Sequence, residues 1–109
     1  MAEPVKVVTV EQLKKMMDEK QEFQLIDVRE RHEKDYSDIG GTLIPMGTVM
    51  QHVDEIRRDI PVIIYCRSGN RSGRVVSMLQ ERFGFTNLYN LAGGILAWAD
   101  RIDPEVKKY

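Results

Sequence analysis

The run VIIY at Val62–Tyr65 is the segment that most constrains how this chain can fold. All four residues are β-branched or aromatic, a composition typical of a central β-strand that is covered on both faces. Cys66 follows this strand directly, and a loop rich in glycine, serine and arginine follows Cys66. The rest of the chain must therefore supply layers that cover both faces of this strand.

Segments typical of strands alternate with segments typical of helices along the chain. Besides Val62–Tyr65, we expect strands at residues 5–8, 23–28 and 87–91, because these runs are short and mostly apolar. We expect four helices. The first starts at Thr9 in a capping box with Gln12, the second runs from Thr48 to before Pro61, the third runs from Ser72 to Gly84, and the fourth covers residues 95–102. This alternation predicts an α/β fold with a mainly parallel sheet.

The segment between the first and second of these helical patterns is less regular. Residues 30–38 are charged, and we expect a solvated segment with one helical turn. Gly40 and Gly41 mark a turn, and residues 42–45 are expected to form a short extended piece.

Length and composition indicate one globular domain over residues 1–109, with 42% hydrophobic residues. The net charge of −1 argues against a nucleic-acid surface, which would be basic. The N-terminus shows no secretory pattern, and no apolar run approaches the roughly 20 residues of a membrane span. We therefore expect a soluble cytoplasmic protein that binds neither nucleic acid nor membrane.

The sequence contains one cysteine, Cys66. A single cysteine excludes an internal disulfide and any multi-cysteine zinc or iron–sulfur site, so we expect no metal and no cofactor. The thiol is then either a buried core residue or a reactive group.

The loop after Cys66 favours the reactive group. Ligands of open parallel sheets bind beyond the C-terminal ends of the strands, where Cys66 lies. A loop that leads into a helix start presents unpaired backbone N–H groups to an anion. Arg67, Arg71 and Arg74 add positive charge, and such surroundings favour the thiolate. We therefore expect Cys66 to face an anion.

Three motifs in this order resemble those of rhodanese domains, the sulfurtransferases that carry sulfane sulfur on a cysteine. In chain order they are IDVRE from Ile26 to Glu30, CRSGNR from Cys66 to Arg71 and LAGGILAW from Leu91 to Trp98, so the resemblance covers most of the chain. It implies a three-layer α/β sandwich with a central sheet flanked by helices.

The resemblance also implies roles for individual residues. Cys66 would be the nucleophile that takes sulfur from a small anionic donor, such as thiosulfate or a persulfide, and becomes a persulfide itself. The donor and the persulfide would be held by the backbone and side chains of the loop residues Arg67, Ser68, Gly69, Asn70, Arg71 and Ser72. A thiol, cyanide or a sulfur-carrier protein would accept the sulfur.

Asp27 and Arg29 match positions that support the loop in this family, and a surface or half-buried ion pair is the alternative interpretation. Trp98 is expected to be a core residue. Residues 38–45 depart from the family because they lack a common histidine, which affects specificity. Residues 102–109 resemble the end of rhodanese domains fused to adenylating enzymes, which favours a protein acceptor.

Three other functions compete with sulfur transfer. Cysteine phosphatases also place a thiolate in an arginine-ended loop, but they need one residue more than the spacing from Cys66 to Arg71. A noncatalytic or redox-sensing module would keep the fold and an exposed, reactive thiol. A cysteine protease would need a base, and His32 and His52 lie in segments that favour surface positions.

Overall fold

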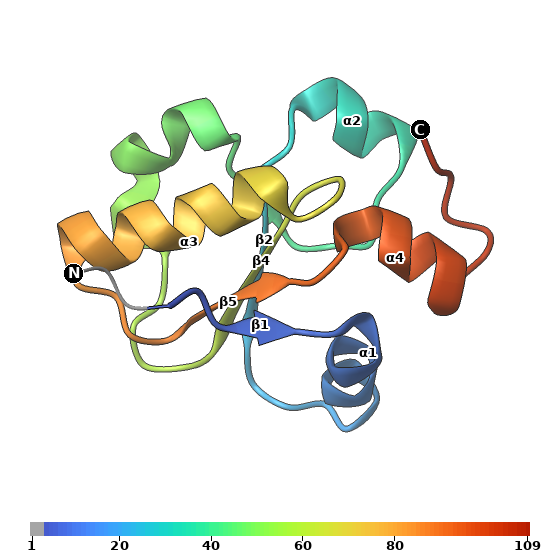
Figure 1. Cartoon of the computed structure of the whole chain (residues 1–109), viewed down its shortest axis with the longest axis horizontal. Coiled ribbons are helices and arrows are strands. Elements are labelled where there is room, and N and C mark those ends of the chain that lie inside the picture. Colours follow the sequence, from blue (N-terminus) through green and yellow to red (C-terminus); the bar gives the residue numbers. More distant parts are fainter. Residues whose placement is uncertain (1–3) are drawn as a thin grey trace.

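The computed structural model describes residues 4–109, so the first three residues of the expected domain lie outside the described residues. Five strands form one parallel sheet in the order β1-β5-β4-β2-β3 (Figure 1). The elements in chain order are β1 Val7–Val8, α1 Val10–Asp18, β2 Gln24–Asp27, α2 Arg31–Tyr36, β3 Thr42–Leu43, the 3₁₀ helix η1 Met46–Glu55, β4 Val62–Tyr65, α3 Asn70–Phe83, β5 Leu88–Leu91 and α4 Gly94–Arg101.

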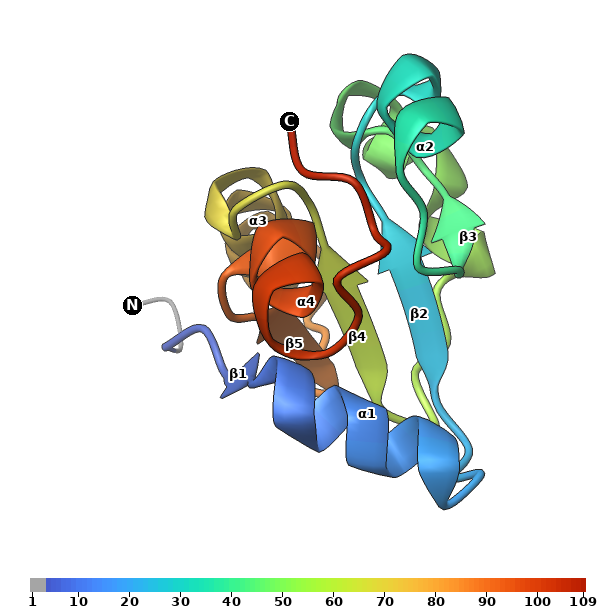
Figure 2. The same cartoon turned by 90° about the vertical axis from the view of Figure 1, so that its right-hand side faces the viewer.

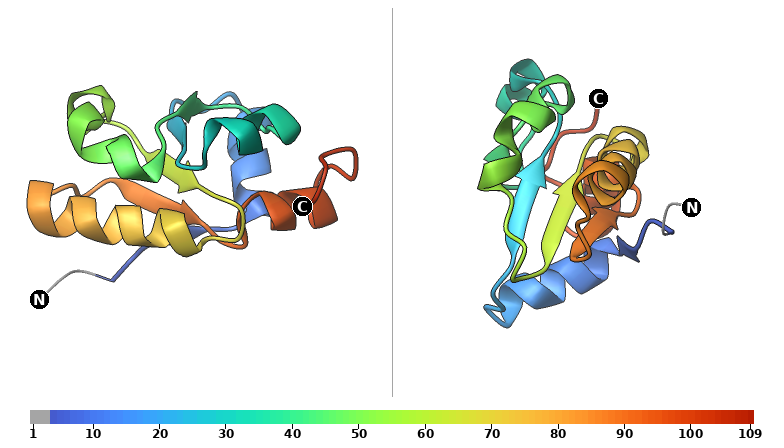
Figure 3. Two further views of the ribbon diagram at one scale, coloured as in Figure 1. Left: turned by 90° about the horizontal axis from the view of Figure 1, so that it is seen from above. Right: turned by 90° about the vertical axis from the view of Figure 1, so that its left-hand side faces the viewer.

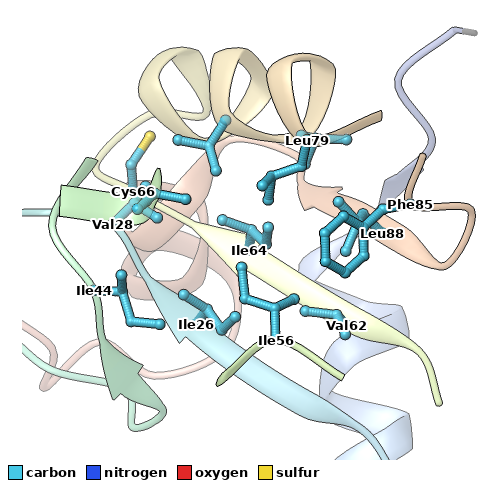
Figure 4. Close-up of a cluster of buried hydrophobic side chains, with 13 residues drawn as sticks. Ile26, Val28, Ile44, Ile56, Val62, Ile64, Cys66, Leu79, Phe85 and Leu88 are labelled. Carbon is cyan, nitrogen blue, oxygen red and sulfur yellow. The ribbon is translucent and has the colours of Figure 1, made fainter. Parts of the chain in front are cut away.

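The central strand β4 divides the hydrophobic core into two layers, because successive side chains of a strand point to opposite faces. Val62, Ile64 and Cys66 belong to the cluster under α3 and η1, part of which Figure 4 shows. Ile63 and Tyr65 belong to the cluster on the other face, with side chains of α1 and α4. The expected three-layer α/β sandwich is confirmed, and Figure 3 shows its strands and helices from two further sides.

Several local predictions from the sequence are confirmed. Thr9 accepts a bond from the backbone N–H of Gln12, whose side chain accepts the N–H of Thr9, so α1 starts in the expected capping box. Gly84 ends α3 in the left-handed conformation. Trp98 of α4 lies in the core, in the same cluster as Val10 and Leu13 of α1. None of the helices within residues 4–109 is long and apolar enough to cross a membrane.

Two expected helix starts are wrong. The segment after β3 starts at Met46 as a 3₁₀ helix, and the Thr48 hydroxyl donates back to the carbonyl of Pro45 instead of capping a helix; the segment also ends at Glu55, well before Pro61. Helix α3 begins at Asn70 rather than Ser72. Gly69 has φ of +105°, and this turn lets the helix start inside the loop.

The expectation of a solvated segment at residues 30–38 is also wrong in part. Residues Arg31–Tyr36 form the helix α2. Glu33 in this helix and Ser37 directly after it are buried. The C-terminal segment lies beside α2 in Figures 1 and 2, and the Ser37 hydroxyl donates to the carbonyl of Lys107. The charged pattern is misleading because tertiary contacts cover one side of this short helix.

Candidate active site

Cys66 lies at the C-terminal end of β4, between the sheet and the first turn of α3. Its sulfur accepts hydrogen bonds from the backbone N–H of Gly69 at 3.1 Å and of Ser72 at 3.4 Å, and the Ser72 hydroxyl lies at 3.3 Å. Cys66 is only 1% exposed, so it is both a core residue and a hydrogen-bonded one.

Burial and hydrogen bonds shift the pKa of the thiol in opposite directions. Burial by itself raises the pKa of Cys66, but bonds from Ser72, Gly69 and Ser68 favour the thiolate and hold the pKa below its ordinary value. A lowered pKa increases the fraction of the nucleophilic form at neutral pH.

The start of helix α4 packs against the loop that follows Cys66. The backbone N–H groups of Ile95 and Leu96 donate to the carbonyls of Cys66 and Arg67, at 3.0 and 3.1 Å. A Cβ atom on Gly94 would lie 2.5 Å from each of these two carbonyl oxygens, so only glycine permits this approach. The LAGGILAW motif thus places the start of α4 against the carbonyl side of the loop.

The two loop arginines have partners that the sequence did not predict. Both terminal nitrogens of Arg71 bind the Glu33 carboxylate, at 2.7 and 2.8 Å. This bond lowers the pKa of Glu33 to about 2. The exposed Arg67 lies over the ring of Tyr109 and donates to its carbonyl oxygen. The positive charge of Arg71 is thus balanced, and the loop is less positive than its sequence indicates.

Asp27 and Arg29 form a completely buried ion pair with bonds of 2.8 and 2.9 Å. The interpretation as a surface or half-buried pair is therefore wrong. Arg29 also donates to the hydroxyl of Tyr109 at 3.0 Å, and that hydroxyl donates to Glu33 at 2.7 Å. The pair thus reaches the loop through Tyr109, Glu33 and Arg71.

The other loop residues differ in exposure. Ser68 and Asn70 are exposed, Gly69 and Arg71 are half-buried, and Ser72 is completely buried beside the sulfur. His32 and His52 give no hydrogen bond to Cys66 in residues 4–109, in agreement with their expected surface positions. Within the described part of the chain, no cluster of side chains could hold a metal ion.

Asn90 on β5 is a site residue that sequence reasoning missed. Its side-chain oxygen lies 2.5 Å from the Ser72 hydroxyl, and its amide nitrogen donates to the Gly69 carbonyl at 3.0 Å. The available signal was the amide at the third position of the strand LYNL, in a largely apolar stretch. Glu33 was hidden in a charged run, and Tyr109 carried no signal.

Comparison with known proteins shows the family of this chain. Residues 9–101 match the family model described as a rhodanese-like domain. The chain is 44% identical over 80 residues to the uncharacterized protein YqhL of Bacillus subtilis, covering 72% of this chain and 63% of YqhL. It is 36% identical over 90 residues to a sulfurtransferase of Allochromatium vinosum, covering 82% of this chain and 83% of that protein.

The structure is similar to that of a rhodanese-like domain protein from Staphylococcus aureus. The TM-score is 0.81 at 28% sequence identity, and the match covers 96% of this chain and 99% of that one. The family match extends from the start of α1 to the end of α4 and includes all three motifs. This chain belongs to the rhodanese-like domain family.

Proposed function

We propose that this protein is a sulfurtransferase that carries sulfane sulfur as a persulfide on Cys66. The hydrogen-bond donors around Sγ give the main support, because Gly69 and Ser72 direct backbone N–H groups at the sulfur within 3.4 Å. A thiolate held by such donors is a nucleophile that is ready to attack a sulfur atom. The sulfurtransferase name of one relative agrees with this role.

The reaction has two displacement steps. In the first, the Cys66 thiolate attacks the outer sulfur of thiosulfate; the new S–S bond forms while the old one breaks, and its electron pair leaves with sulfite. In the second, an acceptor nucleophile attacks the outer sulfur of the persulfide, and the electron pair of that S–S bond returns to Cys66. The sequence contains no second cysteine, so the acceptor is external.

The loop supplies the binding groups in this proposal. Backbone N–H groups from Arg67 to Ser72 stabilise the negative outer sulfur. The exposed Arg67 attracts the anionic donor by its charge. Arg71 contributes less to this attraction, because the Glu33 carboxylate balances its charge and binds both its terminal nitrogens. Ser68 and Asn70 lie on the exposed side of the loop, where the donor enters. The acceptor is a thiol, cyanide or a sulfur-carrier protein.

Intact-mass measurement after incubation with thiosulfate tests the proposal. We expect the wild type to gain one sulfur atom and Cys66→Ser to gain none. Because two oxygen atoms add nearly the same mass, the sample is then treated with cyanide: a persulfide loses its sulfur, whereas a sulfinic acid does not. A wild type that gains no removable sulfur from thiosulfate or from a small persulfide refutes the proposal. Turnover of an aryl phosphate would favour the phosphatase alternative instead.

A further inference from the structure

The Ser72 hydroxyl has two possible acceptors and one hydrogen. Its oxygen lies 3.3 Å from the Cys66 sulfur and 2.5 Å from the side-chain oxygen of Asn90. A hydroxyl donates one hydrogen bond and accepts through its lone pairs. It can therefore donate to the sulfur or to Asn90, but not to both fully.

The orientation of the Asn90 amide is determined by its other contact. The carbonyl oxygen of Gly69 can only accept, so the amide nitrogen of Asn90 must face it, at 3.0 Å. The oxygen of Asn90 then faces Ser72. A Cβ atom on Gly73 would lie 3.2 Å from the same amide nitrogen, so the side chain of Asn90 is closely confined against α3. The acceptor for Ser72 is thus held in place.

We propose that Asn90 is a positioning residue that directs the Ser72 hydroxyl, so that this hydroxyl donates to Cys66 only while the sulfur is negatively charged. When Cys66 is protonated or carries a persulfide, Sγ is a poor acceptor and the hydroxyl donates to Asn90. When Sγ is a thiolate, the charge-assisted bond is the stronger one and the hydroxyl turns to the sulfur.

This inference rests on the proposed sulfur transfer and assigns the hydroxyl to one step of it. In the discharge step, the electron pair of the breaking S–S bond returns to Sγ, and the Ser72 hydroxyl turns from Asn90 to stabilise the new thiolate. In the loading step, Asn90 takes the hydroxyl back as Sγ becomes neutral. No proton is transferred in either turn, because the hydrogen stays on the Ser72 oxygen throughout.

The charge state of Cys66 provides a direct test that needs no sulfur donor. Because the sequence has one cysteine, protein labelled with ¹³C at cysteine Cβ gives a single signal whose pH titration reports the pKa of Cys66. Ser72→Ala removes a donor to the thiolate, and we expect the pKa to rise by about one unit. Asn90→Leu removes the competing acceptor, and we expect the pKa to fall by about half a unit to one unit.

The sign of the Asn90→Leu effect separates positioning from a merely structural role. The variant also loses the bond to Gly69, and a looser loop would donate less well to the sulfur and raise the pKa. In a Ser72→Ala background the proposed fall must disappear, because no hydroxyl remains to be released. Asn90→Ala, which removes the same two polar groups with a smaller side chain, is measured in parallel in case Asn90→Leu does not fold.

A rise or no change in the pKa of Cys66 in the folded Asn90 variant overturns the inference, as does an unchanged pKa in Ser72→Ala. Both results are independent of sulfur transfer. If the protein gains no sulfur from any donor while the titrations behave as expected, the proposed function fails and the hydroxyl still responds to the charge on Cys66. If the protein gains sulfur but the pKa of Cys66 does not change as expected in the variants, only the role of Asn90 fails.

Discussion

Replacing Glu33 by Gln tests how the ion pair behind the loop stabilises the protein. The Glu33 side chain is 9% exposed and binds both terminal nitrogens of Arg71. The bond to Arg71 holds its pKa at about 2, compared with an ordinary value of 4.5. At about 1.4 kcal/mol for each pKa unit, the ionised carboxylate stabilises the folded state by about 3 kcal/mol.

The pH dependence has a definite sign. A carboxylate whose pKa is lowered by folding contributes its full stability above its unfolded pKa, and this contribution is lost as the pH falls through the folded pKa. The wild type should therefore lose about 3 kcal/mol from this group between pH 4.5 and about 2. Glu33→Gln lacks the titrating group, so we expect it to be less stable by about this amount at neutral pH and to approach the wild type near pH 2.

Urea unfolding, followed by circular dichroism at a series of pH values, measures this difference. Glu22→Gln is the matched control, because it makes the same Glu-to-Gln change at an exposed position between α1 and β2. We expect the control to follow the wild type closely. If the stabilities of wild type and Glu33→Gln stay parallel across the acidic range, the ion pair with Arg71 does not stabilise the fold and the reasoning is refuted.

Four further substitutions, one of them a control, test other parts of the structure. Gly94→Ala would place a Cβ atom 2.5 Å from two loop carbonyls, whereas Gly84→Ala has a similar positive φ and open space around it. Urea unfolding should therefore show a loss of more than about 2 kcal/mol for the first and about 1 kcal/mol for the second; equal losses would contradict the close approach of α4. Asp27→Asn leaves the buried Arg29 without its counter-charge and should cost about 3–5 kcal/mol in the same assay, and a loss below about 1 kcal/mol would contradict the complete burial of the pair. Leu79→Ala removes a fully buried side chain between α3 and the sheet, for which we expect about 2–5 kcal/mol, with a negligible loss as the contrary result.

Local chemistry explains why much of the fold could be predicted from the sequence. The composition of Val62–Tyr65 is sufficient to indicate a strand buried on both faces, and all four residues are fully buried. The capping box at Thr9 depends on residues three positions apart, and the stop at Gly84 depends on one residue that tolerates positive φ. The position of Cys66 at the end of β4 and the start of a helix just after it follow from the same short-range signals.

Helix α2 and segment η1 were harder to predict for a physical reason. A helix of six residues has little stability of its own, so tertiary contacts decide whether it forms. The contacts of α2 come from Arg71 and from the C-terminal segment, both far away in sequence. The apolar spacing at Val49, Val53 and Ile56 is that of an α-helix, but the segment forms 3₁₀ turns, and the backbone of His52 interrupts the regular helical geometry.

The sequence by itself determined the alternation of the main strands and helices, the buried strand and the place of the single cysteine at its end, because these depend on neighbouring residues. Only the tertiary structure decided which groups surround that loop. Glu33 binds Arg71 across 38 positions, Asn90 binds Ser72 across 18, and Tyr109 binds Glu33 across 76. The sequence contains 17 acidic side chains, and spacing alone does not select the one that binds Arg71. The folded sheet selects it, because it brings α2, α3, β5 and the C-terminal segment together around the carboxyl end of β4.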